Sequence, residues 1–144
     1  GFLYSTSEEH EAFIAFKSSK ESLGFGAVSE LIKAVIRTMR FRDMIKLVKL
    51  AKKGGESYED SLKKAKKPYV FVGMLVVRRK YQGQGYMRKV LDIAYEEGKK
   101  LGCPVLLDTD AALKRDKYVH LGMKNVRTRK FDEGIVLYDL AKED

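Results

Sequence analysis

The residues best able to do chemistry lie in one basic turn, residues 78–85 (RRKYQGQG). A Gly-x-Gly turn between a strand and a helix leaves backbone N–H groups free at the positive end of the helix dipole. A phosphate group can bind there without a special side chain, and glycine keeps its approach open. The neighbouring cations would attract the same anion. The alternative is a strand-to-helix turn that needs unusual backbone angles and binds nothing.

Two common phosphate-binding motifs do not describe this turn. The Walker motif ends in Gly-Lys-Ser/Thr, and that ending is missing here. The dinucleotide motif Gly-x-Gly-x-x-Gly needs a third glycine at the position where this chain has Arg88. Gly-x-Gly alone is only weak evidence for phosphate binding, so the role of the turn has to be inferred from the elements around it.

The composition indicates one folded, basic domain. The chain has 144 residues, 44% of them hydrophobic, which is enough for one core. Its 29 lysine and arginine residues exceed its 20 acidic residues, so the net charge is +9. This charge favours nucleotides, phosphorylated cofactors, nucleic acid or acidic membrane surfaces as partners, without choosing among them. The alternative is a basic soluble domain with no anionic partner.

The cysteine and histidine content argues against disulfides and metal. A single cysteine, Cys103, cannot form an intramolecular disulfide, and it favours a reducing, cytoplasmic location. Together with two distant histidines, His10 and His120, it forms no metal-binding pattern. No apolar run approaches the roughly 20 residues that a membrane span needs. The first residues contain acids and no apolar signal segment.

The first half of the chain predicts a hairpin followed by basic helices. Short apolar runs at residues 1–4 and 12–16 flank a polar turn, as in a β-hairpin. Residues 28–48 carry apolar side chains at helical spacing among many cations. Such a helix can lie on an acidic membrane, or its charges can form the solvated side of a packed helix. Residues 56–67 predict a further helix that ends at Pro68.

The second half predicts an α/β core. Residues 69–77 are almost all apolar, which is typical of a central strand buried on both faces. After the glycine turn, a helix, a strand, a second helix and two strands are expected at residues 86–102, 105–107, 111–121, 126–130 and 135–140. This order predicts a parallel strand pair joined by a right-handed crossover. We expect a single domain with three parts: the hairpin (1–23), the basic helical segment (24–67) and the α/β core (69–140).

Two motifs in this core resemble the GNAT family, the acetyl-CoA-dependent N-acetyltransferases. The family's cofactor signature is Gln/Arg-x-x-Gly-x-Gly/Ala, and residues 82–87 read QGQGYM. Met87 stands where the signature has a small residue. Downstream, residues 117–123 (KYVHLGM) resemble the family's Tyr-x-x-Leu-Gly-Phe segment. The resemblance covers residues 69–140, and the two motifs occur in the family's order.

The resemblance implies a fold and a cofactor site. The fold would be α/β (α+β), with a mixed, largely antiparallel sheet whose central parallel pair splays at the cofactor site, flanked by helices, and with N-terminal elements reduced or missing. The pantetheine arm of acetyl-CoA would lie between the strands at 69–77 and 105–107, and the turn amides would hold the pyrophosphate. The implied cofactor contacts are Leu75, Val76, Val77, Gln82, Gly83, Gln84, Gly85, Tyr86, Met87, Arg88 and Lys114.

The resemblance also implies direct acetyl transfer from the thioester to a neutral amine. Tyr118 occupies the position of the family's general acid; the alternative is a tyrosine that only packs its ring on the sheet. For the base, Asp108 and Asp110 are the nearest carboxylates in sequence, although aspartates before a helix are also common caps. Glu11, His10 or a chain of solvent molecules are further alternatives.

The sequence therefore predicts an N-acetyltransferase that acts on a primary amine of a small molecule or peptide. We expect no metal, nucleic-acid or membrane partner, and pairing of the terminal strands in a homodimer is a further hypothesis. One alternative is a non-catalytic module that binds CoA or acyl-CoA. Another is a basic protein that binds nucleic acid or membrane surfaces through residues 33–53; its binding would collapse with salt and not depend on Gly83 or Gly85.

Overall fold

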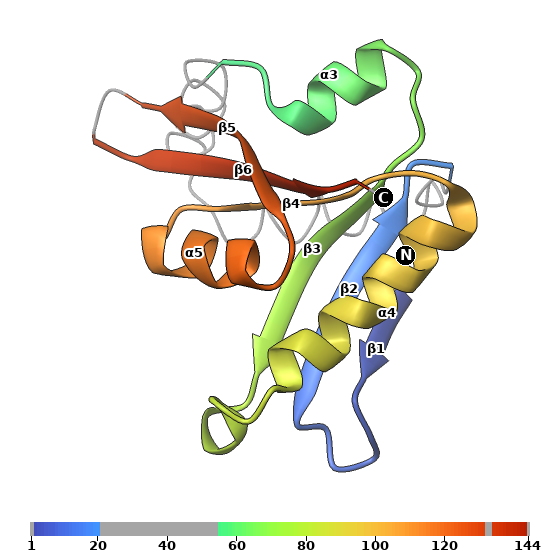
Figure 1. The fold of residues 1–144 in the computed structure, drawn as a ribbon, viewed down its shortest axis with the longest axis vertical. Helices are drawn as coiled ribbons and strands as arrows, with labels where there is room; N and C mark the ends of the chain where they lie inside the picture. Colours follow the sequence, from blue (N-terminus) through green and yellow to red (C-terminus); the bar gives the residue numbers. More distant parts are fainter. Residues whose placement is uncertain (1, 21–54, 132–133, 144) are drawn as a thin grey trace, which may run out of the picture.

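The computed structural model describes residues 2–20, 55–131 and 134–143 (Figure 1). The predicted basic helix at residues 28–48 lies outside these ranges. The elements are β1 (Phe2–Ser5), β2 (Ala12–Ser18), α3 (Tyr58–Lys64), β3 (Val70–Val77), the 3₁₀ helix η1 (Arg79–Tyr81), α4 (Tyr86–Leu101), β4 (Val105–Thr109), α5 (Ala112–His120), β5 (Lys124–Lys130) and β6 (Val136–Lys142). None of the described helices is both long and apolar enough to span a membrane.

The strands form one six-stranded sheet in the order β1-β2-β3-β4-β6-β5. β3 and β4 pair in parallel and are connected through α4, whereas the other neighbours pair antiparallel. The predicted hairpin is confirmed as β1 and β2, and the predicted final strands as β5 and β6. The prediction of a mixed, largely antiparallel sheet with a central parallel pair and flanking helices is therefore confirmed.

The larger core lies between the sheet and α4. Val90, Leu91 and Ala94 of α4 are fully buried and share one side of the helix. They belong to a cluster with buried strand residues such as Ile14 of β2. Tyr118 of α5 is part of the same cluster. The two helices therefore cover one face of the sheet, which we call the α4–α5 face (Figure 1).

A smaller core lies on the opposite face, under α3. Leu62 of α3 clusters with Tyr69, Leu106 and Ala141. Because successive side chains along a strand point to opposite faces, Leu106 faces α3 while Leu107 belongs to the core under α4. We call this second side the α3 face. The fold thus places α4 and α5 on one face of the sheet and α3 on the other.

The prediction that the apolar strand is buried on both faces holds for the start of β3 and is wrong for its end. Val70 and Val72 are buried, whereas Met74 is 44% and Val76 is 45% exposed. Met74 and Val76 alternate with Leu75 and Val77, which pack against the larger core, so the side chains of Met74 and Val76 point to the opposite face of the sheet. The end of β3 is therefore covered on the α4–α5 face and exposed on the other.

Candidate active site

The sheet opens between its two parallel strands. β3 and β4 are paired at two register positions, Val70 with Val105 and Phe71 with Leu106. Among the described strands, the rest of β3 pairs only with β2, and the rest of β4 only with β6. The two strands therefore diverge after their first residues (Figure 1). This divergence leaves one edge of β3, in the middle of the sheet, without a neighbour among the described strands.

A bulge in β3 lies close to the point of divergence. The register with β2 jumps at this point, because Phe16 pairs with Val72 whereas Ala15 pairs with Met74. Gly73 is therefore the extra residue on β3. A bulge bends the strand and changes which residues direct their backbone groups to each side.

Beyond the bulge, alternate residues direct their backbone groups to the open edge. The Arg78 N–H donates to the Glu11 carbonyl at 2.9 Å, which directs the backbone of Arg78 toward β2. By the alternation of an antiparallel ladder, Val76 also faces β2, and Leu75 and Val77 face the open edge. An open strand edge of this kind can bind an extended chain as an added strand. Among the three predicted strand contacts, Leu75 and Val77 lie on that edge and Val76 does not.

The glycine turn has the backbone and the open space that an anion needs. Gly83 and Gly85 have φ angles of +78° and +81°, where side chains are strained, and a Cβ at either would meet nothing within 4 Å. Gly85 is the N-cap of α4, and it has no side chain with which to cap that helix. Its first N–H groups, at the positive end of the dipole, are suited to an anion. Gln82 secures the turn, since its Nε2 donates to the Val77 carbonyl at 3.2 Å.

Aromatic rings hold cations beside this turn. Lys80 Nζ lies 4.6 Å from the centre of the Tyr81 ring, and Lys89 Nζ lies 4.5 Å from that of Tyr86. The Arg78 guanidinium is 5.9 Å from the Tyr81 ring. The two rings meet edge to face, with centres 5.5 Å apart. These cation–π contacts keep positive charge near the turn without neutralising it.

Tyr118 of α5 lies across from the turn. The residue is 8% exposed, and its hydroxyl has no hydrogen-bond partner among the described residues. Burial raises the pKa of Tyr118 above its usual 10.0. The phenol therefore keeps its proton at neutral pH and can donate it. Lys114 precedes Tyr118 by four residues, one helical turn, so the two side chains share one side of α5.

The strand edge, the turn and α5 border one open cleft of about 940 Å³. Its lining residues are Leu75, Val77, Tyr81, Gln82, Gly83, Gly85, Tyr86, Met87, Arg88, Leu113, Lys114, Asp116, Lys117, Tyr118, His120 and Leu121. Of the cofactor contacts predicted from sequence, Val76 and Gln84 are the two that do not line it. The Gln84 side chain instead donates to the Lys80 carbonyl at 3.0 Å. The structure thus brings the predicted turn and the predicted acid to one cleft.

Several lining residues were missing from the sequence prediction. They are Tyr81, Leu113, Asp116, Lys117, His120 and Leu121. Helical spacing from Tyr118 would have pointed to Leu121, which lies three residues further on. Tyr81 could have been found from its place directly before the signature.

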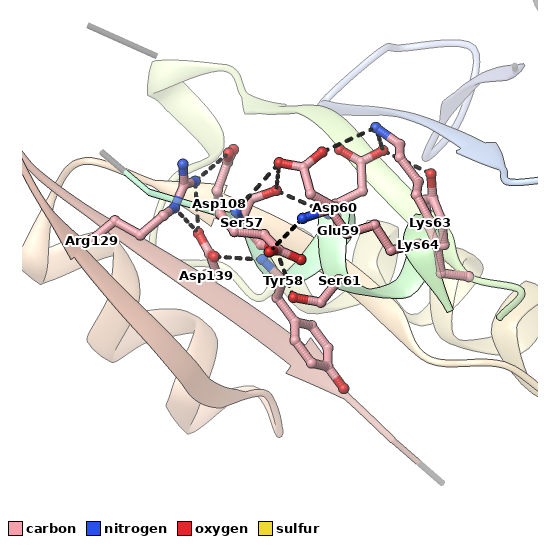
Figure 2. A network of polar contacts seen from close by, with 12 residues as sticks. Ser57, Tyr58, Glu59, Asp60, Ser61, Lys63, Lys64, Asp108, Arg129 and Asp139 are labelled. Atoms are coloured by element: carbon pink, nitrogen blue, oxygen red, sulfur yellow. Dashed lines mark hydrogen bonds and ion pairs between the residues drawn. The ribbon is translucent and has the colours of Figure 1, made fainter. Parts of the chain in front are cut away.

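The predicted base, Asp108, lies on the α3 face and does not line the cleft. It shares its side of β4 with Leu106, which packs under α3. Arg129 Nη2 lies 3.5 Å from Asp108 Oδ2, within a polar network between the sheet and α3 (Figure 2). Tyr118 packs in the core of the opposite face. The structure therefore places the predicted acid and the predicted base on opposite faces of the sheet.

Asp139 is the buried centre of this network (Figure 2). It is 4% exposed, and its Oδ1 accepts from Arg129 Nε at 2.9 Å and Nη2 at 2.8 Å. Its Oδ2 accepts from the backbone N–H of Tyr58, at 2.8 Å, at the start of α3. The same helix begins with a capping box between Ser57 and Asp60. One carboxylate of β6 thus joins β5 to α3.

Asp108 keeps more freedom than Asp139. Its side chain is 46% exposed, and its ion pair with Arg129, at 3.5 Å, is longer than that between Arg129 and Asp139, at 2.8 Å. Burial raises the pKa of Asp108 above its usual 3.8, the charge of Arg129 lowers it, and those of Asp139 and Glu59 raise it further. A raised pKa makes a carboxylate a stronger base.

The helix-cap alternative for Asp108 and Asp110 is wrong. The N-cap of α5 is Ala111, and no side chain caps that helix. Asp108 lies within β4 instead, at the register position opposite Asp139. Because β4 extends to Thr109, two residues further than predicted, the helix begins after both aspartates.

The other two side chains considered as bases lie in the loop between β1 and β2. Hydrogen bonds from the hydroxyls of Thr6 and Ser7 lower the pKa of Glu11 to about 2. A carboxylate with so low a pKa is a weak base. His10 is exposed, and its Nδ1 lies 3.0 Å from Ser5 Oγ. Neither residue lines the cleft.

Cys103 is free and lies beside the larger core, outside the cleft. Burial raises the pKa of its thiol above the usual 9.0, which disfavours the nucleophilic thiolate. Within residues 2–20, 55–131 and 134–143, no group of His, Cys, Asp and Glu side chains could hold a metal ion.

Comparison with known families gives one match. The profile of the acetyltransferase (GNAT) family matches residues 54–122. The matched segment runs from α3 through α5 and includes the strand edge, the glycine turn and Tyr118. A comparison with curated protein sequences gives no match.

Solved structures with this fold include several acetyltransferases. Arylalkylamine N-acetyltransferase 2 of Aedes aegypti is 14% identical, with a TM-score of 0.60 over 95% of this chain and 70% of that chain. The polyamine N-acetyltransferase of Drosophila melanogaster is 12% identical, with a TM-score of 0.59 over 92% of this chain and 69% of that chain. At these identities the likeness shows the fold alone.

A protein assigned as an acetyltransferase in Agrobacterium tumefaciens is 27% identical over 53% of this chain, with a TM-score of 0.48. The match spans 57% of that protein's own length. A separate match covers 53% of the ribosomal-protein-S18-alanine N-acetyltransferase of Escherichia coli. This chain thus aligns with little more than half of these two proteins. The family profile matches the segment that builds the cleft, and solved acetyltransferases share the fold, so the predicted resemblance to the GNAT acetyltransferase family is confirmed.

Proposed function

We propose that this chain transfers an acetyl group from acetyl-CoA directly to a primary amine of a small molecule or a peptide. The observation that carries the proposal is the composition of the cleft. One cavity joins an open strand edge, a glycine turn at a helix N-terminus and the hydroxyl of Tyr118. These features suit the pantetheine amides, the pyrophosphate and the thiolate leaving group of acetyl-CoA, respectively.

The proposed binding uses mainly backbone groups. The backbone of Leu75 and Val77 would pair with the pantetheine amides as an added strand does. The N–H groups around Gly83 and Gly85 would bind the pyrophosphate, where the open space in front of both glycines leaves room for it. The cation of Arg88 would add a charge-assisted contact with a phosphate.

Tyr118 is the proposed general acid. The amine nitrogen attacks the thioester carbonyl carbon, and the carbon–sulfur bond then breaks. The departing thiolate takes the phenolic proton of Tyr118, and the nitrogen loses its extra proton to a base. The Tyr118 hydroxyl has no hydrogen-bond partner among the described residues, which supports this role, because none of them competes for its proton.

Asp108 is the proposed base, acting from the side of the sheet that lies opposite the acid. An amine that enters from the α3 face would meet the thioester between the diverging strands and release its proton to Asp108 directly or through water. The raised pKa of Asp108 and its partial exposure support this role.

The test is thermal unfolding with and without acetyl-CoA, on the wild type and on Gly85→Glu. A ligand at about 100 times its dissociation constant stabilises the fold by roughly 2.7 kcal/mol, which raises the melting temperature by several degrees. Gly85→Glu should lose this shift, because it adds a carboxylate where the pyrophosphate would bind.

Gly55→Glu is the matched control. Gly55 also has a left-handed φ, +78°, and open space around it, but it does not line the cleft. It should keep the shift. A well-folded wild type that acetyl-CoA does not stabilise would contradict the proposal.

A second candidate is a module that binds CoA without transferring the acetyl group. Met87 lines the cleft in place of the family's small residue, so its side chain takes space near the turn. A panel of arylalkylamines, polyamines and peptide N-termini separates the two candidates. Stabilisation by CoA with no acetylated product from any amine would favour the binding module.

A further inference from the structure

We propose that Glu11, in the loop between β1 and β2 (residues 6–11), is a positioning residue that fixes the phosphate-binding turn of the cofactor site. The inference rests on the proposed binding of acetyl-CoA. Glu11 does not line the cleft, so its effect would pass through the residues that it holds.

The carboxylate of Glu11 is buried and binds other residues of its own loop. The residue is 8% exposed. Its Oε2 accepts from Thr6 Oγ1 at 2.6 Å and from Ser7 Oγ at 2.7 Å. Thr6 Oγ1 in turn accepts from the backbone N–H of Ala12 at 3.2 Å. Because a buried carboxylate is costly unless it is hydrogen-bonded, these contacts favour one conformation of the loop.

The same loop contacts both ends of η1. At one end, the Arg78 N–H donates to the Glu11 carbonyl at 2.9 Å, and Arg78 Nη1 donates to the Glu9 carbonyl at 3.0 Å. At the other end, the Tyr81 hydroxyl donates to Glu9 Oε2 at 3.3 Å. The short helix η1 leads directly into Gln82, so the loop determines where the glycine turn begins.

These contacts matter because the turn binds through its backbone. Left-handed glycines are conformationally free, and ordering a flexible turn on binding lowers affinity. A turn that is already held in place avoids that loss. The β1–β2 loop lies beside η1 and the start of α4 (Figure 1). It holds the turn without lining the cleft.

The test compares Glu11→Ala, Ser7→Ala and the control Glu8→Ala, which changes an exposed carboxylate of the same loop. Calorimetry should show a dissociation constant for CoA that is about tenfold higher in Glu11→Ala, less changed in Ser7→Ala and unchanged in Glu8→Ala. Binding of pantetheine, which has no pyrophosphate, should be unchanged in all three variants.

Amide hydrogen exchange without ligand gives a second reading. Glu11→Ala should accelerate exchange in residues 78–87 and leave α5 unchanged. Equal CoA binding by wild type and Glu11→Ala would overturn the inference, and so would faster exchange throughout the molecule, which indicates a merely structural role. A wild type that does not bind CoA contradicts the proposed function instead, and the exchange measurement then still decides whether Glu11 positions the turn. If Glu11→Ala does not fold, Ser7→Ala takes its place in both measurements.

Discussion

The two faces of the sheet are held by different kinds of interaction. On the α4–α5 face, aliphatic residues of α4 such as Val90 and Leu91 are fully buried in the larger core. On the α3 face, a smaller apolar cluster lies beside an ion pair between Arg129 and Asp139, whose carboxylate also binds α3. Apolar burial has no preferred direction, whereas a buried ion pair depends on each partner. The helices on the α4–α5 face are therefore held by apolar packing, and α3 depends on a few specific hydrogen bonds.

The largest expected effect comes from breaking the network on the α3 face. Asp139→Ala leaves the Arg129 guanidinium, whose side chain is 10% exposed, without its buried partner. Removing one member of a buried pair typically costs about 3–5 kcal/mol. Urea unfolding should show this loss. Because the cleft lies on the other face, the folded variant should still bind acetyl-CoA.

Lys100→Ala is the control, because it removes a surface ion pair of 3.9 Å with Glu97 and should change stability by less than about 1 kcal/mol. An equally small loss in Asp139→Ala would mean that α3 does not depend on the network.

A second test separates the catalytic roles proposed for the two faces. Tyr118→Phe removes the proposed acid and keeps the ring in its core. The turnover number should fall about 100-fold, while the dissociation constant of CoA stays within about twofold. Steady-state kinetics and calorimetry measure the two quantities. An unchanged turnover number would show that the leaving group takes its proton from elsewhere.

A third test disturbs the packing of the α4–α5 face. A Cβ added to Gly98 of α4 would lie 2.5 Å from Val105 Cγ2 and 2.9 Å from the Cys103 carbonyl oxygen. Overpacking of this kind costs about 1–3 kcal/mol, so Gly98→Ala should lower the melting temperature. Gly73→Ala is the control, since a Cβ there would meet nothing within 4 Å. A stable Gly98→Ala variant would mean that α4 can shift away from β4.

The smallest effect concerns the titration of Asp108 on the α3 face. Since the folded pKa lies above the usual 3.8, the unfolded chain loses this proton at lower pH than the folded one. Ionisation therefore lowers stability as pH rises through this window, and the loss is complete above the folded pKa. Asp108→Asn removes this ionisation. The free energy of unfolding of the variant, relative to that of the wild type, should therefore be higher at pH 7 than at pH 3. Urea unfolding at both pH values checks this, and a relative loss would mean that the ion pair with Arg129 dominates.

The sequence predicted most elements because their signals are local. Alternating and helical periodicity located the hairpin, α4, α5 and the last two strands. The divergence of β3 from β4 could not be predicted, because it depends on which register positions pair and on a bulge at Gly73. Met74 and Val76 are exposed because they point away from the larger core, and their apolar character gave the opposite indication.

For the candidate site, too, the parts that lie in local motifs could be predicted, and the parts that depend on the tertiary fold could not. The glycine turn and Tyr118 belong to contiguous motifs, and both line the cleft. The position of Asp108 near the end of a strand indicates a possible base. The face of the sheet on which it lies depends on the alternation of side chains along β4. The predicted strand has only three residues, which is too short to determine that alternation. The contact of Glu9 and Glu11 with Arg78 joins residues about 70 positions apart, and no local pattern reports such a contact.

The divergence of the parallel strands also divides the sheet into two halves. One consists of β1, β2 and β3 under α4, and the other of β4, β6 and β5 with α5. The register positions of Val70 and Phe71 are the only ones at which the halves share strand pairing in the described sheet. A molecule bound along the open edge of β3 and against α5 would therefore bridge both halves. Such a ligand would take the place of a strand between the two halves. Its binding would therefore be coupled to the association of the halves.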